Sequence, residues 1–167
     1  MKLEKHIRDI PDFPKKGILF KDITTLLNNK KVFKKAVDDM AKALRGKKID
    51  YIVAAESRGF IFGSVLAYRL NCGFVPVRKP GKLPGKTYCH TYSLEYGKDS
   101  LEIHRDAFPA GSKVLVLDDL LATGGTALAS VKLVEKLKGK VAAIIFLIEL
   151  TFLKGRDKLK KYPVISL

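Results

Sequence analysis

Residues 114–126 decide the fold and read Val-Leu-Val-Leu-Asp-Asp-Leu-Leu-Ala-Thr-Gly-Gly-Thr. An apolar run leads directly into two adjacent carboxylates, Asp118 and Asp119, and a turn of small residues follows them. A helical spacing of apolar residues begins at Ala127. We interpret the stretch as a buried strand, a turn whose backbone N–H groups face an anion, and a helix that points its positive end at the same place.

The chemistry of this turn favours a phosphorylated sugar as the ligand. Glycine lets the backbone approach a phosphate closely, and Thr123 and Thr126 add hydroxyl donors. The two carboxylates face a phosphate unfavourably, so we expect them to face ribose hydroxyls or a hydrated Mg²⁺. The alternative is an ordinary strand–turn–helix connection, but paired acids at such a place cost stability unless something uses them.

Length and composition indicate one globular domain over residues 1–167. The chain has 167 residues and is 47% hydrophobic, which is enough for a sizeable core. No apolar stretch reaches the length of a membrane span, and the first residues lack the apolar middle of a signal peptide. Cys72 and Cys89 are too few for a disulfide framework and lack the spacing of a metal site. We therefore expect a cytoplasmic protein with no membrane partner.

The charge balance raises the question of nucleic-acid binding. Lysine and arginine number 32 against 17 acidic residues, a net charge of +15. Most of the lysines are interspersed with apolar residues in helix-like segments, as is typical of solvated helix faces. The sequence has no recognisable helix-turn-helix, zinc finger or aromatic RNA-binding motif. We therefore expect no specific nucleic-acid partner, and we attribute only the basic cluster at 78–86 to a polyanionic small substrate.

Apolar periodicity predicts alternating helices and strands along the whole chain. The predicted helices cover residues 32–44, 59–70 and 127–138. The predicted strands cover residues 50–55, 74–77, 114–117 and 141–150, the last as a long central strand. Segments 88–95 and 100–104 bracket a tight turn at 96–99 and predict an antiparallel pair. The alternation predicts an α/β fold with a parallel twisted sheet flanked by helices on both faces.

Three motifs follow three of the predicted parallel strands. Residues 56–59 (Glu-Ser-Arg-Gly) follow the first strand, Arg78 and Lys79 the second, and the paired acids the third. Binding crevices in such sheets lie beyond the carboxyl ends of the strands. We therefore expect these loops, far apart in sequence, to converge on one crevice.

Residues 81–87 (Gly-Lys-Leu-Pro-Gly-Lys-Thr) look at first like a nucleoside-triphosphate P-loop. That motif requires four residues between its glycines, and this segment has three. The residues that follow do not predict a helix. We interpret the segment instead as a mobile basic lid, in which Lys79, Lys82 and Lys86 reach toward an anion; the alternative is a disordered surface loop.

Five segments of the chain resemble the type I phosphoribosyltransferases. Residues 118–126 resemble the family's signature for 5-phosphoribosyl 1-pyrophosphate (PRPP). Four further segments match in the family's order: 13–23, 56–60, 77–85 and 92–97. The last two point to the purine branch and to the adenine phosphoribosyltransferases. The resemblance implies a single domain of the type I phosphoribosyltransferase fold, with an N-terminal hood (1–30) and a lid with an antiparallel hairpin (78–104).

The resemblance also implies an activity and its partners. The enzyme would transfer the 5-phosphoribosyl group of PRPP to N9 of adenine, giving AMP and pyrophosphate through an oxocarbenium-like transition state. Mg²⁺ would be the cofactor, carried with the pyrophosphate. The implied role is purine salvage in the cytoplasm, and the implied assembly is a homodimer.

Matching residues can be assigned to each part of the substrates. The 5-phosphate and ribose would contact Asp118, Asp119, Ala122, Thr123, Gly124, Gly125 and Thr126. The pyrophosphate would contact Glu56, Ser57, Arg58, Arg78, Lys79 and Lys82. The adenine would contact Leu19, Phe20, Lys21 and Arg58. No residue is assigned as a direct ligand of the metal, although Asp118 and Asp119 would lie near it.

The resemblance assigns three residues to the chemical step: Glu95, Arg58 and Lys79. Glu95 would take a proton from an imidazole nitrogen of the purine as N9 attacks; its alternative role is a charged turn residue in the hairpin. Arg58 would donate toward a ring nitrogen of the purine, and Lys79 would neutralise the pyrophosphate. A non-proline cis peptide, common in the family's turn, is expected at Glu56–Ser57.

Two other functions remain open at the level of the sequence. One is a phosphoribosyltransferase for another purine base, such as hypoxanthine, guanine or xanthine. Residues 149–153 (Glu-Leu-Thr-Phe-Leu) offer no lysine to read a 6-oxo group, which disfavours it. The other is a regulator of the same fold that senses PRPP and binds nucleic acid. Such regulators carry an added DNA-binding domain, and this chain starts almost at once with the hood.

Overall fold

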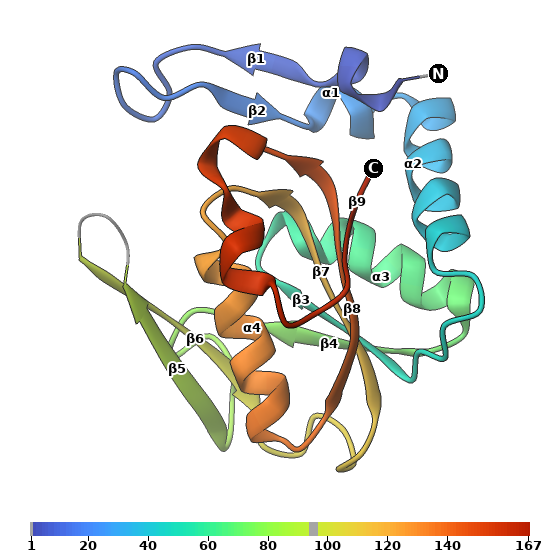
Figure 1. The fold of residues 1–167 in the computed structure, drawn as a ribbon, viewed down its shortest axis with the longest axis vertical. Coiled ribbons are helices and arrows are strands. Elements are labelled where there is room, and N and C mark those ends of the chain that lie inside the picture. The colour runs from blue at the N-terminus through green and yellow to red at the C-terminus, as the bar shows by residue number, and fades with distance from the viewer. Residues whose placement is uncertain (1, 94–96) are drawn as a thin grey trace.

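The computed structural model describes residues 2–93 and 97–167, and its centre is a parallel sheet. Within the described residues the sheet has five strands in the order β4-β3-β7-β8-β9 (Figure 1). Its members are β3 (Tyr51–Ala55), β4 (Gly73–Val77), β7 (Lys113–Leu121), β8 (Lys140–Glu149) and β9 (Val164–Ser166). All neighbouring pairs are parallel, as the sequence predicts. The carboxyl ends of the strands therefore share one edge.

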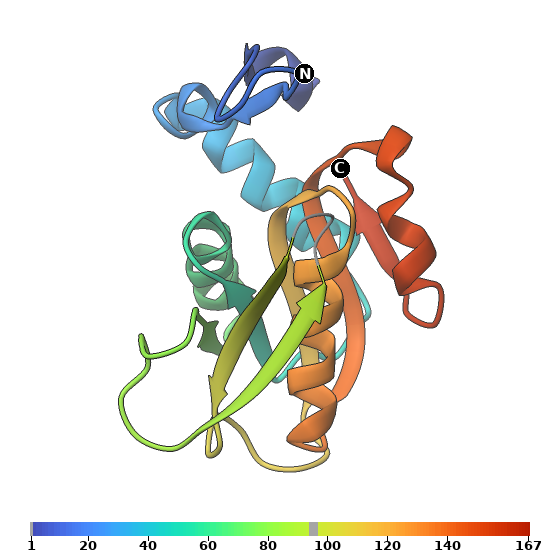
Figure 2. The ribbon, with the colours of Figure 1, turned by 90° about the vertical axis from the view of Figure 1, so that its left-hand side faces the viewer.

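Helices cover both faces of the sheet, which confirms the layered α/β prediction (Figure 2). α2 (Lys30–Ala43) and α3 (Arg58–Leu70) lie on one face, and α4 (Gly125–Lys136) lies on the other. The residues of β7 alternate between the two cores. Leu115 and Leu117 belong to the cluster under α2 and α3, whereas Val114 and Val116 belong to the cluster under α4. Burial on both sides explains why the strand is an unbroken apolar run.

Local signals define the ends of the helices. The Asn29 side chain accepts from the backbone N–H of Lys31 at 3.2 Å and so starts α2. Asn71 adopts the left-handed conformation that ends α3. Lysines on α2 form exposed i,i+4 pairs, as with Lys34 and Asp38. In the described ranges, no helix is long and apolar enough to cross a membrane.

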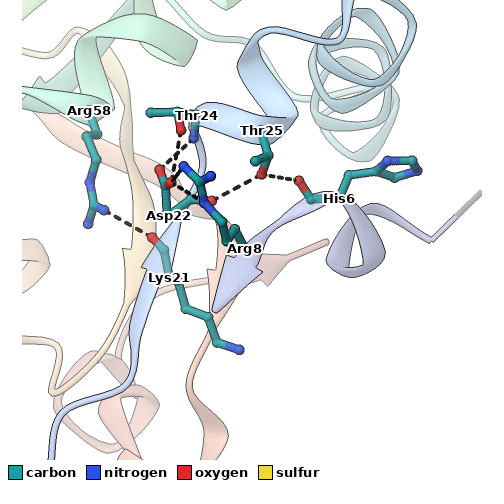
Figure 3. Close-up of polar contacts among 7 residues, drawn as sticks. All are labelled: His6, Arg8, Lys21, Asp22, Thr24, Thr25 and Arg58. Atoms are coloured by element: carbon teal, nitrogen blue, oxygen red, sulfur yellow. Dashed lines mark hydrogen bonds and ion pairs between the residues drawn. The ribbon is translucent and has the colours of Figure 1, made fainter. Parts of the chain in front are cut away.

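The N-terminal hood lies across the carboxyl edge of the sheet (Figure 1). It consists of η1 (Leu3–His6), β1 (Arg8–Ile10), β2 (Phe20–Asp22) and α1 (Thr24–Leu27), with β1 and β2 antiparallel. Asp22 holds it together, because its carboxylate accepts from Arg8 and from the N–H and hydroxyl of Thr24 (Figure 3). The N–H of Thr24, and then Arg8, lower the pKa of Asp22 to about 2.

The antiparallel hairpin is confirmed and stands beside the main sheet. It pairs β5 (Thr87–Ser93) with β6 (Lys98–His104), and Leu101 and Ile103 of β6 are buried in the core under α4. The predicted turn at 96–99 is wrong at its end, because β6 already begins at Lys98. Residues 94–96, which include Glu95, lie outside the described residues.

Three further predictions about strands need correction. β7 does not end at Leu117 but continues to Leu121, because Asp118 pairs in register with Phe146 and Leu121 with Glu149 of β8. The acids are therefore inside the strand rather than after it. β8 is not central, since β7 occupies the centre. β9 is absent from the prediction, and its three residues complete the sheet beside β8.

Candidate active site

The two acids of β7 lie at the carboxyl edge of the sheet, beneath the hood. Asp119 is 3% exposed and Asp118 is half-buried, and the Asp119 N–H donates to Asp118 Oδ1 at 2.9 Å. Burial raises the pKa of Asp118 well above its usual range, and the neighbouring Asp119 carboxylate adds to the shift. Burial also raises the pKa of Asp119, against the pull of Arg58. The pair therefore stores an electrostatic cost that a ligand can relieve.

Glycine at position 59 makes room for the first acid. A Cβ atom added to Gly59 would lie 3.2 Å from Asp118 Oδ1 and 3.4 Å from the Leu117 carbonyl oxygen. The amino-terminal turn of α3 can therefore pack directly against the end of β7. This close approach explains why the Glu-Ser-Arg-Gly segment and the paired acids, 59 positions apart at Gly59 and Asp118, share one site.

The turn after the acids is an uncapped helix start. Gly124, with φ of +82°, is the N-cap of α4, and no side chain in the described part of the chain caps the first N–H groups of the helix. Those groups have no acceptor inside the helix and point out of its positive end. A cavity of about 70 Å³ lies at this turn, lined by Asp118, Leu120, Leu121, Ala122, Thr123, Gly124, Gly125, Thr126, Ala127 and Phe146. The arrangement can hold an anion.

The C-terminal segment around Gly155 packs directly against this turn, a contact that the sequence did not predict. A Cβ atom on Gly124 would lie 2.5 Å from the carbonyl oxygen of Gly155, and one on Gly155 would lie 2.3 Å from that of Ala122. Gly155 begins the 3-10 helix η3 (Gly155–Leu159), which leads toward β9. The only signal in the sequence was the glycine itself, and its partner is 31 positions away.

Arg58 joins the hood to the acids. Its Nε atom lies 2.9 Å from Asp119 Oδ2. Its Nη1 atom donates to the Lys21 carbonyl oxygen at 3.3 Å, as Figure 3 shows. Its guanidinium also lies 5.1 Å from the centre of the Phe20 ring. Within the described residues, no donor is aligned for a hydrogen bond to the buried Asp119 Oδ2 atom. That oxygen is paired with Arg58 by charge and keeps the capacity to accept a hydrogen bond.

The hood residues expected to contact adenine lie together beside Arg58. Leu19 is 48% exposed, and Phe20 packs edge-to-face on Phe13 with 5.1 Å between ring centres. The Lys21 side chain turns away from the crevice and pairs with Asp9, with 2.6 Å from Nζ to Oδ1. Only the backbone of Lys21 therefore faces Arg58, in agreement with recognition through the main chain.

The Glu56–Ser57 peptide is cis, as expected. Glu56 Oε1 accepts from the Lys79 backbone N–H at 2.7 Å and lies 3.3 Å from Arg78 Nε. Burial raises the pKa of Glu56, but the Lys79 amide and Arg78 outweigh it, so the pKa lies below its usual value. Glu56 thus ties the loop after β3 to the loop after β4.

The basic segment 78–86 lies along the hairpin. The Lys79 ammonium forms an ion pair with Asp99 of β6, and the Gly81 N–H donates to Glu102 Oε2 at 3.3 Å. His104 Nε2 lies 2.6 Å from the Pro84 carbonyl oxygen. Lys82 is exposed, and its carbonyl lies 3.5 Å from Arg78 Nη1. The structure therefore brings Arg78 and Lys79 to the crevice edge together with Glu56.

The donors near the crevice fit a metal ion that arrives with its ligand. Within residues 2–93 and 97–167, no three His, Cys, Asp or Glu side chains form a site of their own. The carboxylates of Asp118 and Asp119 are hard oxygen donors, and one buried oxygen of Asp119 lacks an aligned hydrogen-bond donor. Mg²⁺ commonly binds through one or two carboxylates together with substrate phosphates. The carboxylates of Asp118 and Asp119 fit that mode.

Comparison with known proteins agrees with this geometry. Residues 22–166 match the family model of the phosphoribosyl transferase domain. The adenine phosphoribosyltransferase of Brachyspira hyodysenteriae is 62% identical over 164 residues, covering 98% of this chain and 96% of the relative. A crystal structure of the Thermoanaerobacter pseudethanolicus enzyme has a TM-score of 0.97 at 62% identity, covering 99% of this chain and 98% of that chain.

A second solved structure was determined with ligands. It is the adenine phosphoribosyltransferase from Saccharomyces cerevisiae, complexed with an imino-altritol bisphosphate and adenine. Its TM-score is 0.92 at 48% identity, covering 98% of this chain and 95% of that chain.

Proposed function

Since this chain belongs to the adenine phosphoribosyltransferase family, we infer that it transfers the 5-phosphoribosyl group of PRPP to N9 of adenine, giving AMP and pyrophosphate. One observation in the structure carries this conclusion. Arg58 contacts Asp119 on the sugar side and Phe20 and the Lys21 backbone on the base side. A purine bound at the hood would therefore stand next to a ribose held by the acids.

We propose that the turn 122–126 binds the 5-phosphate. Its free N–H groups at the start of α4 and the hydroxyls of Thr123 and Thr126 supply donors, and Gly124 and Gly125 remove side chains from the approach. Asp118 and Asp119 accept from the 2- and 3-hydroxyls of the ribose. Asp119 Oδ2 is paired with Arg58 but accepts no aligned hydrogen bond from the described residues, which supports this role.

The adenine lies between the hood and the carboxyl edge of the sheet in this proposal. Phe20 covers one face of the purine, and the backbone at Leu19 and Lys21 pairs with its polar edge. The Arg58 guanidinium, already stacked beside Phe20, donates toward a ring nitrogen. Recognition by the main chain explains how the Lys21 side chain can be engaged with Asp9 at the same time.

The pyrophosphate is assigned to the loops after β3 and β4. Ser57 and Arg58 approach from the first loop, and Arg78, Lys79 and Lys82 from the second. Glu56 contributes through its bond to the Lys79 amide, because a carboxylate in contact with pyrophosphate would repel it. This assignment makes the segment 78–86 the lid over the leaving group.

The chemical step needs charge stabilisation on both sides of the breaking bond. Cleavage of the C1–O bond builds positive charge on the ribose, which the acids of β7 offset. It builds negative charge on the departing pyrophosphate, which Lys79 and Arg58 offset. Mg²⁺ bound with PRPP would neutralise the same leaving group, near Asp118 and Asp119. Glu95 is proposed, from the sequence motif, to accept the purine proton as N9 attacks.

We also propose a homodimer. Ile61, Val65 and Tyr68 form an exposed apolar stripe along α3, and Tyr68 is 90% exposed. Apolar side chains at this spacing on one helix face indicate a surface that a partner covers. A cytoplasmic location is proposed because Cys72 and Cys89 are both free thiols.

A panel of bases tests the proposed function. The purified enzyme is given PRPP, Mg²⁺ and each of adenine, hypoxanthine, guanine and xanthine, and nucleotide formation is followed. The expected result is AMP formed far faster than IMP, GMP or XMP. Faster formation of IMP or GMP would overturn the assignment to adenine. No nucleotide from any base, with retention of DNA at physiological salt in a gel shift, would favour a regulator.

A further inference from the structure

The lid lysine has a partner that the reaction does not explain. Lys79 forms its ion pair with Asp99 of β6, and the two side chains are 44% and 27% exposed. The Lys79 backbone is already fixed by Glu56. The ion pair is a second contact of the same residue, and it determines where the ammonium group lies.

Asp99 is itself firmly held. Its Oδ1 atom accepts from the Ser100 N–H at 2.8 Å, and its Oδ2 atom accepts from the Tyr92 hydroxyl at 3.2 Å. Burial raises the pKa of Asp99, but the Lys79 ammonium and the Ser100 amide outweigh it, so the pKa lies below its usual value. The carboxylate is therefore ionised at neutral pH and points at Lys79 in a fixed orientation.

The same network reaches the phosphate turn. The Tyr92 hydroxyl lies 3.2 Å from Thr126 Oγ1, and a Cβ atom on Gly125 would lie 3.2 Å from the Tyr92 ring. Asp99 thus lies between the lid and the turn assigned to the 5-phosphate. A carboxylate at this place occupies Lys79 with the kind of charge that the leaving group of PRPP carries.

We propose that Asp99 is the resident counter-ion of Lys79 and that the pyrophosphate group displaces it when substrate or product binds. This inference rests on the proposed function. Asp99 is a positioning residue, because it acts on pyrophosphate only through Lys79. It keeps the lysine ordered and neutralised in the empty enzyme, and the bound state requires this ion pair to break. Asp99 therefore weakens pyrophosphate binding and favours its release.

The test is the substitution Asp99→Asn. Asparagine removes the charge and keeps the Oδ1 acceptor for the Ser100 N–H. Its NH2 group takes the place of Oδ2 and can donate to the Tyr92 hydroxyl oxygen. A partly exposed ion pair contributes modestly, so we expect the Kd of pyrophosphate, measured by calorimetry with Mg²⁺ present, to fall about two- to five-fold. The KM for PRPP should fall in the same direction, while kcat stays level or decreases as product leaves more slowly.

Two controls separate this role from a general effect of charge. Asp106→Asn removes an exposed carboxylate seven positions along the chain and should leave the Kd unchanged. In a Lys79→Gln background, Asp99→Asn should no longer alter the Kd, because the competing partner is gone.

Each outcome decides the proposal. An unchanged or higher Kd for pyrophosphate in Asp99→Asn overturns it. An equal fall of the Kd when Asp99→Asn is made in the Lys79→Gln background also overturns it. A lower Kd in Asp99→Asn that is seen only when Lys79 is present supports it. Formation of AMP by the unaltered enzyme is scored separately. Its absence would remove the proposed function, whereas AMP formation with no change in the Asp99 variant would remove only this inference.

Discussion

At the scale of single residues, the paired acids of β7 carry an electrostatic cost that lowers the stability of the fold. Asp118 and Asp119 are adjacent, largely buried, and have pKa values raised by that burial. A structural role would be better served by amides, which keep the hydrogen bonds without the charge. This cost supports the proposal that the two carboxylates bind a ligand.

Asp118→Asn should stabilise the protein while it disables the enzyme. A carboxyl whose folded pKa is raised favours the fold when protonated, and that contribution is lost as the pH rises through the folded pKa. The asparagine variant has no such loss. Its Tm should therefore exceed that of the unaltered protein by about 2–4 °C for each kcal/mol added to the free energy of unfolding. The difference in Tm should be larger at pH 8 than at pH 5. AMP formation should fall steeply.

Differential scanning calorimetry of both proteins across this pH range checks the sign. A gain in Tm that shrinks as the pH rises would contradict the raised pKa. A lower Tm at every pH would show that the charge of Asp118 stabilises the empty protein.

At the scale of elements, the turn 122–126 depends on contact with a distant segment. Gly124 combines a left-handed φ with a close approach to the Gly155 carbonyl. Any side chain at 124 must push η3 away or deform the turn. The turn proposed to bind phosphate therefore depends on two glycines from different parts of the chain.

Gly124→Ala should reduce both stability and affinity for AMP. The backbone conformation and the clash together should cost about 1–3 kcal/mol. Gly46→Ala is the matched control, since Gly46 has a similar φ of +78° but open space around it. It should show only the conformational cost, with unchanged affinity for AMP. Chemical denaturation and AMP calorimetry measure both effects, and equal losses of affinity in the two variants would contradict the account.

The elements differ in how far the sequence could predict them. The helices and the longer strands follow from local periodicity, and the rule that parallel strands end at one edge brought Arg58, Lys79 and the paired acids together correctly. The extension of β7 to Leu121 could not be predicted, because it depends on register with β8. β9 has three residues and no periodicity of its own.

The candidate site shows the same limit. The motif residues were found because each lies in a contiguous signature. Gly155 and Asp99 were missed because their importance lies in contacts made across 31 and 20 positions, with Gly124 and Lys79 respectively. Arg58 was assigned to the pyrophosphate and adenine, and its bond to Asp119 became visible only in three dimensions.

At the scale of the whole molecule, the positive surface charge and the apolar stripe on α3 bear on which partners the protein binds. The net charge of +15 is the excess of the 32 basic residues over the 17 acids. Part of the positive charge is locally paired, because lysines contact acids on the same helices, as Lys35 does with Asp39 and Lys132 with Glu135. This supports the interpretation of the lysines as solvated helix faces. The apolar stripe on α3 supports the proposed homodimer.

Tyr68→Lys should convert a dimer to a monomer. The side chain is 90% exposed in the single chain, so the substitution should leave the fold intact and act only on association. Leu167→Lys, at another exposed apolar position, is the matched control and should not change the mass in solution. Light scattering coupled to size exclusion measures the result. A monomeric parent, or a dimeric Tyr68→Lys variant, would contradict an interface on α3.

The central claim is that the turn 122–126, which follows Asp118 and Asp119, binds the phosphate of the nucleotide. A crystal structure with AMP bound tests it most directly. The account predicts phosphate oxygens that accept from the N–H groups of residues 123–126, ribose hydroxyls against Asp118 and Asp119, and adenine beside Phe20 and Arg58. A phosphate bound elsewhere, with those N–H groups facing solvent, would contradict it.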